Sequence, residues 1–408
     1  MSLLKKERKM EQKDFKMVAK TMFGLEDVLA NELEALGAKN VEKLNRAVSF
    51  EGDMNMLYKA NYQLRTAITI LKPIYSFEAN SDKELYDNIY KYKWEKLINA
   101  DGVLSIEPSV YSSIFTHSLY ASQKTKDAIC DRFRRMFNQR PTLTKENPDL
   151  ILNLHINENQ VTVSLNSSGD SLHRRNYRLR AEMAPINEVL AAGLIQLSGW
   201  KRDCNFFDPM CGSGTMVIEA AMFAYNIPAQ YYRYDFAFKK WADFSMPEFR
   251  RVRDEADKGI KEFDYEIWGS DISGSAIKTA TENINNAKLH KDIQLFRSDI
   301  QEQDPPEGKT LIIMNPPYGQ RIETDDLFNL YDIIGRVFKN KYSGNTAWLI
   351  SSDLEAFKYV ALRPSQKITV YNSNLECKFC KYDIYDGSKK AKKQQGNQEE
   401  QDYQEEQD

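Results

Sequence analysis

Asn315, Pro316, Pro317 and Tyr318 follow a run of apolar residues in the segment "TLIIMNPPYGQR", and their chemistry suits the alkylation of an amine. The amide oxygen of Asn315 and the carbonyl oxygen of Pro316 can each accept one N–H of an exocyclic amine on guanine or adenine. That amine is a weak nucleophile because its lone pair is delocalised into the ring, and two fixed acceptors draw the nitrogen toward tetrahedral geometry. The proline rings restrict φ and fix the direction of the carbonyl. The motif therefore predicts a pre-organised amine site with these four residues as its catalytic residues.

Tyr318 is expected to stack on the base, which has to leave its helix or come from a loop to reach such a pocket. A strong general base is not needed, since the amine becomes acidic once alkylated and can lose its proton to water. None of the four histidines of the chain lies in this motif, and none is assigned a catalytic role. The alternative is a proline turn that merely ends a strand, with Asn315 as its cap.

A glycine-rich turn in "FFDPMCGSGTMVIEAAM" predicts a cofactor site between a buried strand and a helix. Gly212 and Gly214 let the backbone approach a ligand without a Cβ atom in the way. No lysine follows the glycines, which excludes a phosphate-binding P-loop, and Val217 stands where a dinucleotide site has its third glycine. Cys211 is expected to be a small packing residue, since a cysteine nucleophile should lie beside the base rather than in this turn.

Two aspartates end the next two predicted strands, Asp271 in "WGSDIS" and Asp299 in "FRSDI". In open parallel sheets, ligands bind at the carboxyl ends of the strands. Asp271 is thus placed to accept hydrogen bonds from ribose hydroxyls, and Asp299 to meet an adenine amine. Taken singly, each aspartate could equally be a helix cap or a loop residue.

From about residue 187 the chain alternates strands with helices, the pattern of a doubly wound α/β sheet. Seven strands are predicted, in the segments "CNFFDPM", "YEIWGSD", "IQLFRSD", "TLIIMNP", "TAWLISSD", "KITVYNS" and "KFCKYDIYD". An aromatic and basic insertion separates the first two. Its aromatic residues, which are expected to pack in a core rather than to touch substrate, include Tyr231, Tyr232, Tyr234 and Trp241.

The motifs "DPMCGSGT", "GSDIS", "SDI" and "NPPYGQR", in this order, resemble those of class I S-adenosylmethionine-dependent methyltransferases. The segment "HRRNYRLRAEMAPINEVLAAGLI" is similar to the bacterial large-subunit ribosomal RNA guanine-N2 methyltransferases, which are often loosely described as adenine-specific DNA methylases. The resemblance implies a Rossmann-like seven-stranded domain with S-adenosylmethionine as cofactor. It implies that Asp208 and the glycine turn surround the methionine part, Asp271 the ribose and Asp299 the adenine. The cofactor-binding residues that it implies are Asp208, Pro209, Cys211, Gly212, Ser213, Gly214, Thr215, Asp271, Ile272, Asp299 and Ile300.

The N-terminal half is predicted to hold two α+β modules. Residues 15–75 follow a β-α-β-α-β pattern, typical of a small ferredoxin-like unit, and residues 76–168 end in a hairpin near Glu158 and Asn159. The segment "TMFGLEDVLANELEALGA" resembles the start of the same family's ferredoxin-like segment and RNA-binding THUMP domain. The expected divisions are a flexible leader (1–14), a ferredoxin-like segment (15–75), a THUMP domain (76–168), a basic linker (169–186), the methyltransferase domain (187–387) and a disordered tail (388–408).

Two basic segments are candidate RNA contacts. "SLHRRNYRLRAE" gathers cationic side chains around an aromatic ring, so that arginines can bind phosphates and the ring can stack on a base. "CDRFRRMFNQR" is expected to be an amphipathic helix with a basic face. The alternatives are a solvated linker with incidental charge and an ordinary helix surface. The residues predicted to contact RNA are His173, Arg174, Arg175, Tyr177, Arg178, Arg132 and Arg135.

The composition is that of a globular protein, with 42% hydrophobic and 28% charged residues. Cys377 and Cys380 form a C-x-x-C without a second pair or a histidine cluster, so strand cysteines rather than a metal site are expected. No stretch approaches the roughly 18 apolar residues of a membrane helix, and the N-terminus has no apolar signal core, so a cytoplasmic location is expected. The net charge of -3 owes much to the acidic tail, so any basic footprint must be local.

The resemblance implies an enzyme that methylates the N2 amine of a guanine in 23S rRNA, either free or in a ribosome-assembly intermediate. A tRNA guanine-N2 or an N6-adenine nucleic-acid methyltransferase would use the same motifs. A methyltransferase acting on a protein glutamine would need no RNA module, and a non-enzymatic RNA-binding factor would need no intact cofactor turn. RNA is the expected partner, with no membrane and no metal, and a monomer is favoured over an oligomer.

Overall fold

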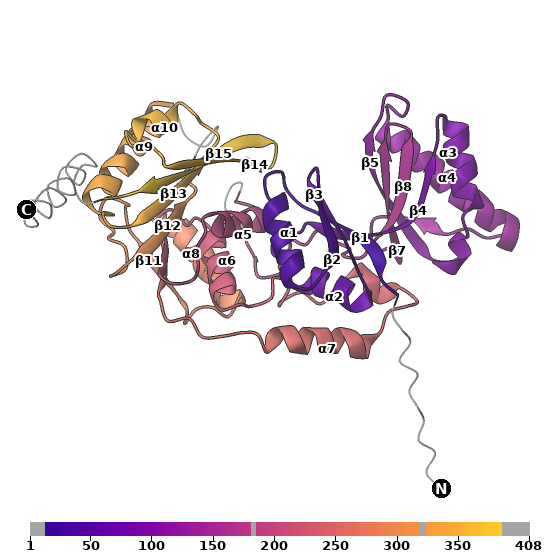
Figure 1. Ribbon diagram of the computed structural model, residues 1–408, viewed down its shortest axis with the longest axis horizontal. Helices are drawn as coiled ribbons and strands as arrows, with labels where there is room; N and C mark the ends of the chain where they lie inside the picture. Colours follow the sequence, from indigo (N-terminus) through magenta and orange to yellow (C-terminus); the bar gives the residue numbers. More distant parts are fainter. Residues whose placement is uncertain (1–12, 181–184, 318–323, 386–408) are drawn as a thin grey trace, which may run out of the picture. The chain divides into compact units, whose positions relative to one another are not determined.

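The computed structural model describes residues 13–180, 185–317 and 324–385, which fall into two compact units (Figure 1). The first unit contains the described residues up to Arg175 together with Pro228–Ile260, and the second contains the remainder. The insertion at 228–260, expected within the methyltransferase domain, therefore belongs to the first unit. The basic linker expected at 169–186 is likewise divided, after Arg175. Most of the predicted leader and all of the predicted tail lie outside the described residues.

The first unit is built on one eight-stranded sheet with the order β2-β3-β1-β4-β8-β7-β5-β6. Its strands are β1 (Phe15–Lys20), β2 (Lys39–Leu44), β3 (Ala47–Gly52), β4 (Thr69–Glu78), β5 (Val103–Tyr111), β6 (Thr142–Leu143), β7 (Leu150–Asn157) and β8 (Gln160–Asn166). Its helices are α1 (Glu26–Ala35), α2 (Met54–Gln63), α3 (Asp82–Lys91), α4 (Ser118–Phe137) and α7 (Met246–Asp257), with single 3₁₀ turns at Trp94–Lys96 and Ala237–Lys240.

Strand β4 makes the two predicted modules one sheet. It pairs antiparallel with β1, where Ile70 lies opposite Ala19, and further along with β8, where Phe77 lies opposite Val161. The predicted boundary between residues 75 and 76 thus falls inside a strand. The predicted hairpin of β7 and β8 is confirmed. Strand β2 was not predicted, because an edge strand whose side chains are nearly all exposed, and half of them charged, lacks the alternation that marks a half-buried strand.

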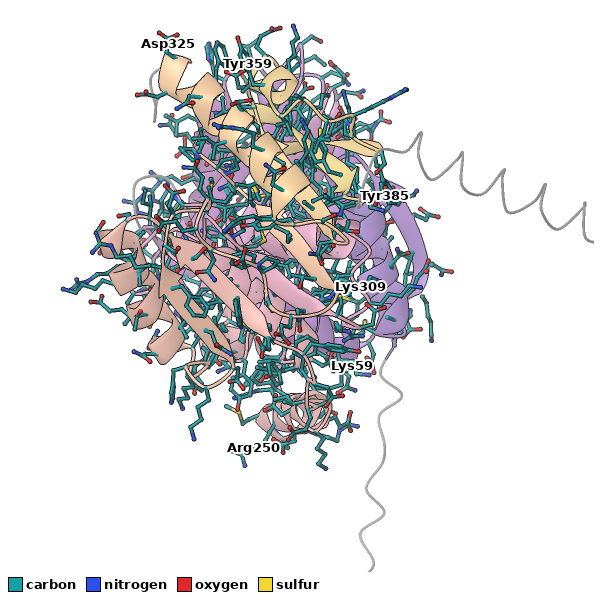
Figure 2. The ribbon with its side chains drawn as sticks, turned by 90° about the vertical axis from the view of Figure 1, so that its left-hand side faces the viewer. Lys59, Arg250, Lys309, Asp325, Tyr359 and Tyr385 are labelled. Atoms are coloured by element: carbon teal, nitrogen blue, oxygen red, sulfur yellow. The ribbon has the colours of Figure 1, made fainter. Side chains whose placement is uncertain are left out.

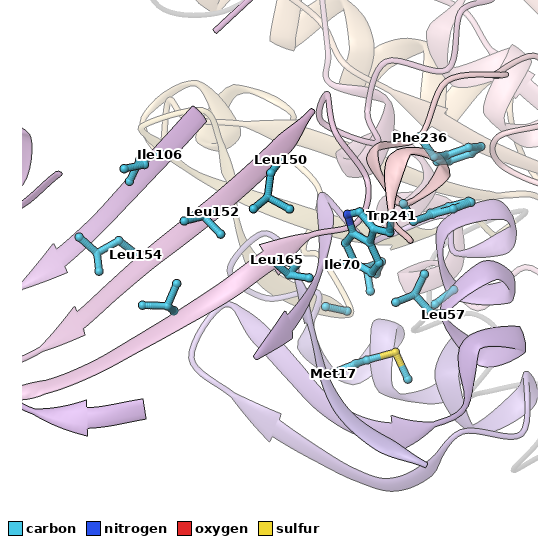
Figure 3. Packing of buried hydrophobic residues seen from close by; sticks show 14 of the residues in the cluster. Met17, Leu57, Ile70, Ile106, Leu150, Leu152, Leu154, Leu165, Phe236 and Trp241 are labelled. Carbon is cyan, nitrogen blue, oxygen red and sulfur yellow. The ribbon is translucent and has the colours of Figure 1, made fainter. Parts of the chain in front are cut away.

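A hydrophobic core extends along the first unit's sheet and includes the insertion (Figure 3). Figure 3 shows Trp241 of the insertion beside Ile70 of β4. Phe236 stacks on Phe238 with ring centroids 5.1 Å apart, and both rings are buried. Packing was expected for the insertion's aromatic residues, and Trp241 confirms it, whereas Tyr234 is exposed. The insertion therefore stabilises the first unit although its sequence lies between two strands of the second.

The second unit is built on a seven-stranded sheet with the order β11-β10-β9-β12-β13-β15-β14. All seven predicted strands are present: β9 (Asn205–Asp208), β10 (Ile267–Asp271), β11 (Ile293–Arg297), β12 (Thr310–Met314), β13 (Thr346–Ser351), β14 (Gln366–Asn372) and β15 (Leu375–Asp383). Its helices are α5 (Glu188–Leu197), α6 (Thr215–Ala224), α8 (Gly274–Asn286), α9 (Thr324–Asn340) and α10 (Ala356–Tyr359). Central strands β9 and β12 are buried throughout, as their continuous apolar runs predict for parallel strands covered on both faces.

The carboxyl ends of the parallel strands meet at one edge of this sheet. β9 pairs in parallel with β10 on one side and with β12 on the other. The residues that end or follow these strands, Asp208, Asp271 and Asn315, are therefore brought to a common edge. Within the second unit, Figure 2 shows Asp325 and Tyr359, which follow β12 and β13, at the top of the view and well above Lys309 at the amino end of β12. Within the described ranges, no helix is long and apolar enough to cross a membrane.

Candidate active site

The turn between β9 and α6 is held in a shape that needs glycine at two positions. Gly212 and Gly214 have φ values of +53° and +81°, in the left-handed region that costs other residues energy. A Cβ atom on Gly214 would also lie 3.1 Å from the Cβ of Ala280 on α8. The backbone N–H of Cys211 donates to the Ser270 carbonyl at 2.9 Å and ties the turn to the end of β10. The turn is thus fixed closely against its neighbours.

Asp271 links two turns at the sheet edge. Its Oδ2 accepts a hydrogen bond from the Gly212 N–H at 3.0 Å, and its Oδ1 accepts one from the Ser273 N–H at 2.9 Å. These contacts fix the orientation of the carboxylate, and the residue also lines a pocket. Asp271 could be a helix cap or a ligand-binding residue according to the sequence. Its geometry is compatible with both roles.

A pocket of about 570 Å³ opens at the carboxyl edge of the sheet. A volume of this size suits a drug-sized ligand. The predicted site residues that line it are Asp208, Pro209, Cys211, Gly212, Ser213, Thr215, Asp271, Ile272, Asp299, Ile300, Asn315 and Pro317. The lining residues that were not predicted are Pro185, Ile186, Met210, Met216, Ser273, Ala276 and Leu330. Among the predicted residues, Gly214 and Pro316 are not part of the lining, and Tyr318 lies outside the described residues.

Burial controls the protonation of two groups beside the turn. It raises the pKa of the Asp208 carboxyl to about 8. The negative charge of Asp271 raises this pKa further, whereas the hydrogen bond from the Met210 N–H lowers it. Burial also raises the pKa of the Cys211 thiol well above its usual value, and the carboxylates of Asp208 and Asp271 add to the effect. A thiol that resists ionisation is a poor nucleophile, which agrees with the packing role predicted for Cys211.

Asn315 carries a buried amide oxygen at the wall of the pocket. Its Oδ1 is buried and accepts no hydrogen bond from any residue that the structure describes. Leaving a buried acceptor unsatisfied costs about 1–3 kcal/mol, so such groups are rare in folded proteins unless a ligand supplies the missing donor. Asn315 also lines the pocket, so its amide lies at the wall where a ligand would bind. Within the described residues, this oxygen caps no backbone N–H, which leaves the alternative of a strand cap without support there.

The segment predicted as an RNA strip is partly buried, which corrects two of its assignments. Arg175 is almost fully buried in the first unit, where its guanidinium donates to the carbonyls of Leu172 and Arg65. Tyr177 is fully buried in the second unit, and its hydroxyl donates to Glu219 Oε1 at 2.9 Å. A base cannot stack on a ring that solvent does not reach, and a buried guanidinium cannot bind a phosphate. The predicted RNA contacts of Arg175 and Tyr177 are therefore wrong.

Two further predicted RNA ligands are engaged by carboxylates. Arg178 forms an ion pair with buried Glu188 at 3.1 Å and donates to Thr215 Oγ1 at 2.8 Å, so it supports the first turn of α6. Arg132 makes a bidentate contact with Glu95 at 2.6 and 2.8 Å. Bidentate pairs of this kind orient both partners. These contacts give both arginines structural roles in place of the predicted binding of phosphate.

The remaining predicted RNA ligands keep accessible surface. Arg174 is exposed and pairs with Asp170 at 3.0 Å, and Arg135 is exposed with a long contact of 3.4 Å to the Tyr90 hydroxyl. His173 is half-buried, with its Nδ1 2.7 Å from Ser171 Oγ. Exposed ion pairs are weak and exchange readily. RNA contact at Arg174, Arg135 and His173 therefore stays a prediction.

Asn283 on α8 was not predicted, yet it connects the strap Asn176–Arg180 to the glycine turn. Its Oδ1 accepts from the N–H groups of Leu179 and Arg180 at 2.9 and 3.3 Å. Its Nδ2 donates to the carbonyls of Arg180 and Ser213 at 3.1 and 3.0 Å. A buried asparagine that satisfies both ends of its amide fixes the three segments relative to one another. No pattern in the sequence marks it, because its partners are backbone groups far along the chain.

Replacing Asn283 by alanine should lower the free energy of unfolding by roughly 2–4 kcal/mol. Each lost hydrogen bond costs about 1 kcal/mol, and the backbone groups left buried add to the loss. Asn285→Ala, on the exposed side of the same helix, is the matched control and should change stability by less than about 0.5 kcal/mol. Urea unfolding of the three proteins measures the difference. Equal stability of both variants would show that the strap is held by other contacts.

Comparisons with known proteins agree with this geometry. Three family models match along the chain: an RlmL ferredoxin-like domain at residues 16–71, a THUMP domain at 79–166 and an RMKL-like methyltransferase domain at 175–381. A protein of Syntrophotalea carbinolica named "Ribosomal RNA large subunit methyltransferase K/L" is 36% identical over 88% of this chain and 52% of its own length. The chain thus spans about half the length of that relative.

Two other proteins match along nearly their whole length. A protein of Synechocystis sp., provisionally named an RNA methyltransferase, is 33% identical over 89% of this chain and 95% of its own. The crystal structure of SMU.472 with SAH, provisionally described as a methyltransferase, superposes with a TM-score of 0.82 at 28% identity, covering 92% of this chain and 99% of that one. The strand order of the second unit and these matches both indicate a methyltransferase domain. The chain belongs to the family defined by the RMKL-like methyltransferase domain, with its RlmL-type ferredoxin-like and THUMP domains.

Proposed function

We propose that the protein transfers a methyl group from S-adenosylmethionine to the exocyclic N2 amine of a guanine in 23S rRNA. The observation that carries the proposal is the Oδ1 of Asn315, which has no hydrogen-bond partner among the described residues and belongs to a side chain lining the same pocket as the strand-end aspartates. An acceptor oriented in advance suits a reaction whose nucleophile is an N–H group. The name of the Syntrophotalea relative supports ribosomal RNA as the substrate class.

The pocket fits S-adenosylmethionine on three counts. The left-handed glycine turn exposes backbone to it, and a Cβ atom on Gly212 would meet no atom within 4 Å, so that side of the turn is open. Asp271 holds a carboxylate at the edge where ribose hydroxyls bind in folds of this kind. Asp299 and buried Ile300 line the part of the pocket next to β11, where a polar group beside an apolar surface suits an adenine ring. SAH in the SMU.472 structure supports the same ligand class.

S-adenosylmethionine, when bound, supplies an electrophilic methyl group on a sulfonium. The residues of this chain hold the acceptor amine. Asn315 Oδ1 accepts one N–H, and the Pro316 carbonyl accepts the other, which turns the nitrogen lone pair away from the base plane. Pro317 stiffens the segment, and Tyr318, outside the described residues, stacks on the base. The alkylated amine loses its proton to water, so alignment and fixed dipoles account for most of the rate enhancement.

The alternative functions differ in the molecule that receives the methyl group, and the first unit favours RNA as that molecule. Adenine N6 and a protein glutamine amide also present N–H groups that Asn315 could bind. The THUMP match at 79–166 supports an RNA substrate over DNA or a protein. The choice of guanine N2 over adenine N6 rests on the resemblance of the sequence motifs to guanine-N2 methyltransferases. The choice of ribosomal RNA over tRNA rests on the name of the Syntrophotalea relative.

Methyl transfer to parallel substrates tests the proposal. The purified protein is incubated with methyl-labelled S-adenosylmethionine and, separately, with unmodified 23S rRNA transcript, tRNA, duplex DNA and a translation release factor. We expect label in the 23S rRNA, recovered as N2-methylguanosine by mass spectrometry of the nucleosides. Label in the release factor or the DNA alone, or in N6-methyladenosine, would assign a different acceptor to the site.

A further inference from the structure

Four large apolar side chains lie exposed within ten residues of the first unit. Tyr111 ends β5 with 65% of its surface exposed, and Ile114 lies in the following loop with 42%. Leu119 and Tyr120, in the first turn of α4, are 69% and 44% exposed. We call these four residues the 111–120 ledge. Isolated apolar residues on a surface need no explanation, but four exposed ones within ten residues of one strand end, loop and helix start form a candidate interaction site.

The loop that carries the ledge is held in one conformation by its own polar groups. Ser112 Oγ donates to the Glu158 carbonyl at 2.7 Å and accepts from the N–H groups of Ile114 and Phe115 at 3.0 and 3.1 Å. Glu158 Oε2 accepts from the N–H and the hydroxyl of Ser113 at 3.1 and 2.8 Å. Phe115 is buried and anchors the loop in the core. The exposed rings are therefore presented without the entropy cost of ordering a flexible loop on binding.

The charged side chains within the segment that carries the ledge are cationic. The stretch from Pro108 to Lys126 contains His117, Lys124 and Lys126 and no carboxylate. The Lys124 ammonium lies over the Tyr120 ring, 5.4 Å from its centroid. The nearby carboxylate of Glu158 is occupied by Ser113, and these hydrogen bonds lower its pKa. The surface thus combines exposed aromatic rings with cations.

The rings have polar neighbours on the open face of the sheet. Tyr111 lies 6.1 Å from His155 of β7, measured between ring centroids. His155 in turn lies opposite Thr162 of β8, and Thr162 opposite Ser76 of β4. A protein partner would favour an extended apolar surface here, whereas an unpaired nucleotide needs a ring for its base together with cations and hydroxyls for its phosphate and sugar.

We propose that the 111–120 ledge binds unpaired bases of the substrate RNA by stacking on Tyr111 and Tyr120. The inference rests on the proposed function for its choice of RNA and deepens it by naming the contact surface. The sequence predicted RNA contacts at Arg132, Arg175 and Tyr177, whose side chains form hydrogen bonds within the protein. The present proposal moves the RNA contacts to the end of β5 and the amino end of α4. Exposed Arg134 and Arg135, near the other end of this 20-residue helix, can meet phosphates of an adjoining duplex.

Binding of the full chain to unmodified 23S rRNA transcript tests the ledge, with a fully paired RNA duplex as second ligand. Tyr111→Ala/Tyr120→Ala should bind the transcript at least about tenfold more weakly, since stacking contributes that much per base, and the duplex within about twofold of the wild type. Tyr111→Phe/Tyr120→Phe keeps both rings and should restore binding. Tyr265→Ala, which removes a ring 43% exposed in the second unit, is the matched control and should bind both ligands like the wild type. Affinity for S-adenosylmethionine should be unchanged in all four proteins.

Three outcomes would overturn the inference. The first is a double alanine variant that binds the transcript with wild-type affinity. The second is a double alanine variant that loses equal affinity for the transcript and the duplex. The third is a change in the sedimentation of this variant showing that the ledge joins two copies of the chain. A wild-type protein that binds the transcript through the ledge without methylating it would contradict the proposed function alone. Normal methylation by a double alanine variant with unchanged affinity would contradict the ledge alone.

Discussion

Asn315→Ala should lower the rate of methyl transfer by roughly 10²–10³-fold while leaving the affinity for S-adenosylmethionine within about twofold. The loss is of the size seen when one pre-organised polar contact to a reacting group is removed. The Asn315 oxygen has no partner within the described structure, so the side chain is available to orient a substrate amine. Single-turnover rates with labelled cofactor, together with equilibrium binding of the cofactor, separate the two effects.

The same variant should not lose stability, and this distinguishes a catalytic role from a structural one. Removing a buried acceptor that is unsatisfied in the folded protein is neutral or stabilising. The melting temperature of Asn315→Ala should therefore equal or exceed that of the wild type. Asn315→Gln keeps the amide but moves its oxygen by one methylene, and it should be nearly as slow as the alanine variant. A fall in stability with activity intact would return Asn315 to the role of a strand cap.

The sheet of the second unit could be predicted from the sequence because its signals are local. A buried parallel strand needs a short apolar run, and the residue after it lies at the ligand-binding edge, so Asp208, Asp271 and Asn315 could be placed without coordinates. All three line the pocket. The seven predicted strands are present, although β15 pairs antiparallel with both of its neighbours.

The errors arose where a residue's role depends on distant partners. Arg175 and Tyr177 have the composition of an RNA-binding strip, but their burial is decided by Arg65 and Glu219, 110 and 42 residues away in sequence. The same reason hides Asn283, whose partners are backbone groups of the strap and the turn. Local composition identifies what a side chain can bind, and only the fold decides whether that capacity is used internally.

The insertion shows a second limit of the sequence. Its aromatic density correctly indicates a core, but the strands on either side of it lie in the second unit, and nothing in the local pattern shows that its core belongs to the first. Phe236 and Trp241 pack there with residues from β1, α2 and β4. The exposed ledge was missed for a related reason, since "YSSIFTHSLY" has no periodicity that separates its buried Phe115 from its exposed neighbours.

Gly335→Ala should destabilise the second unit by about 2–3 kcal/mol or more. A Cβ atom at position 335 of α9 would lie 2.1 Å from the carbonyl oxygen of Val360 and 2.8 Å from its carbonyl carbon. These are backbone atoms at the end of α10 and cannot rotate away, so the two helices would have to separate. Alanine is otherwise favoured over glycine within a helix by about 1 kcal/mol, so a net loss would show that the close approach outweighs helix propensity.

Urea unfolding measures this loss, and Gly274→Ala is the matched control. A Cβ atom on Gly274, at the start of α8, meets only the flexible Arg297 side chain at 3.4 Å, so that variant should change stability by less than about 0.5 kcal/mol. Separation of α9 from α10 would also disturb the stack of Phe328 on Tyr359, whose ring centroids lie 4.3 Å apart. Since Leu330 of α9 lines the pocket, Gly335→Ala should lose part of its methyl transfer even where it remains folded. A Gly335→Ala protein as stable as the wild type would mean that α10 is held too loosely for the contact to matter.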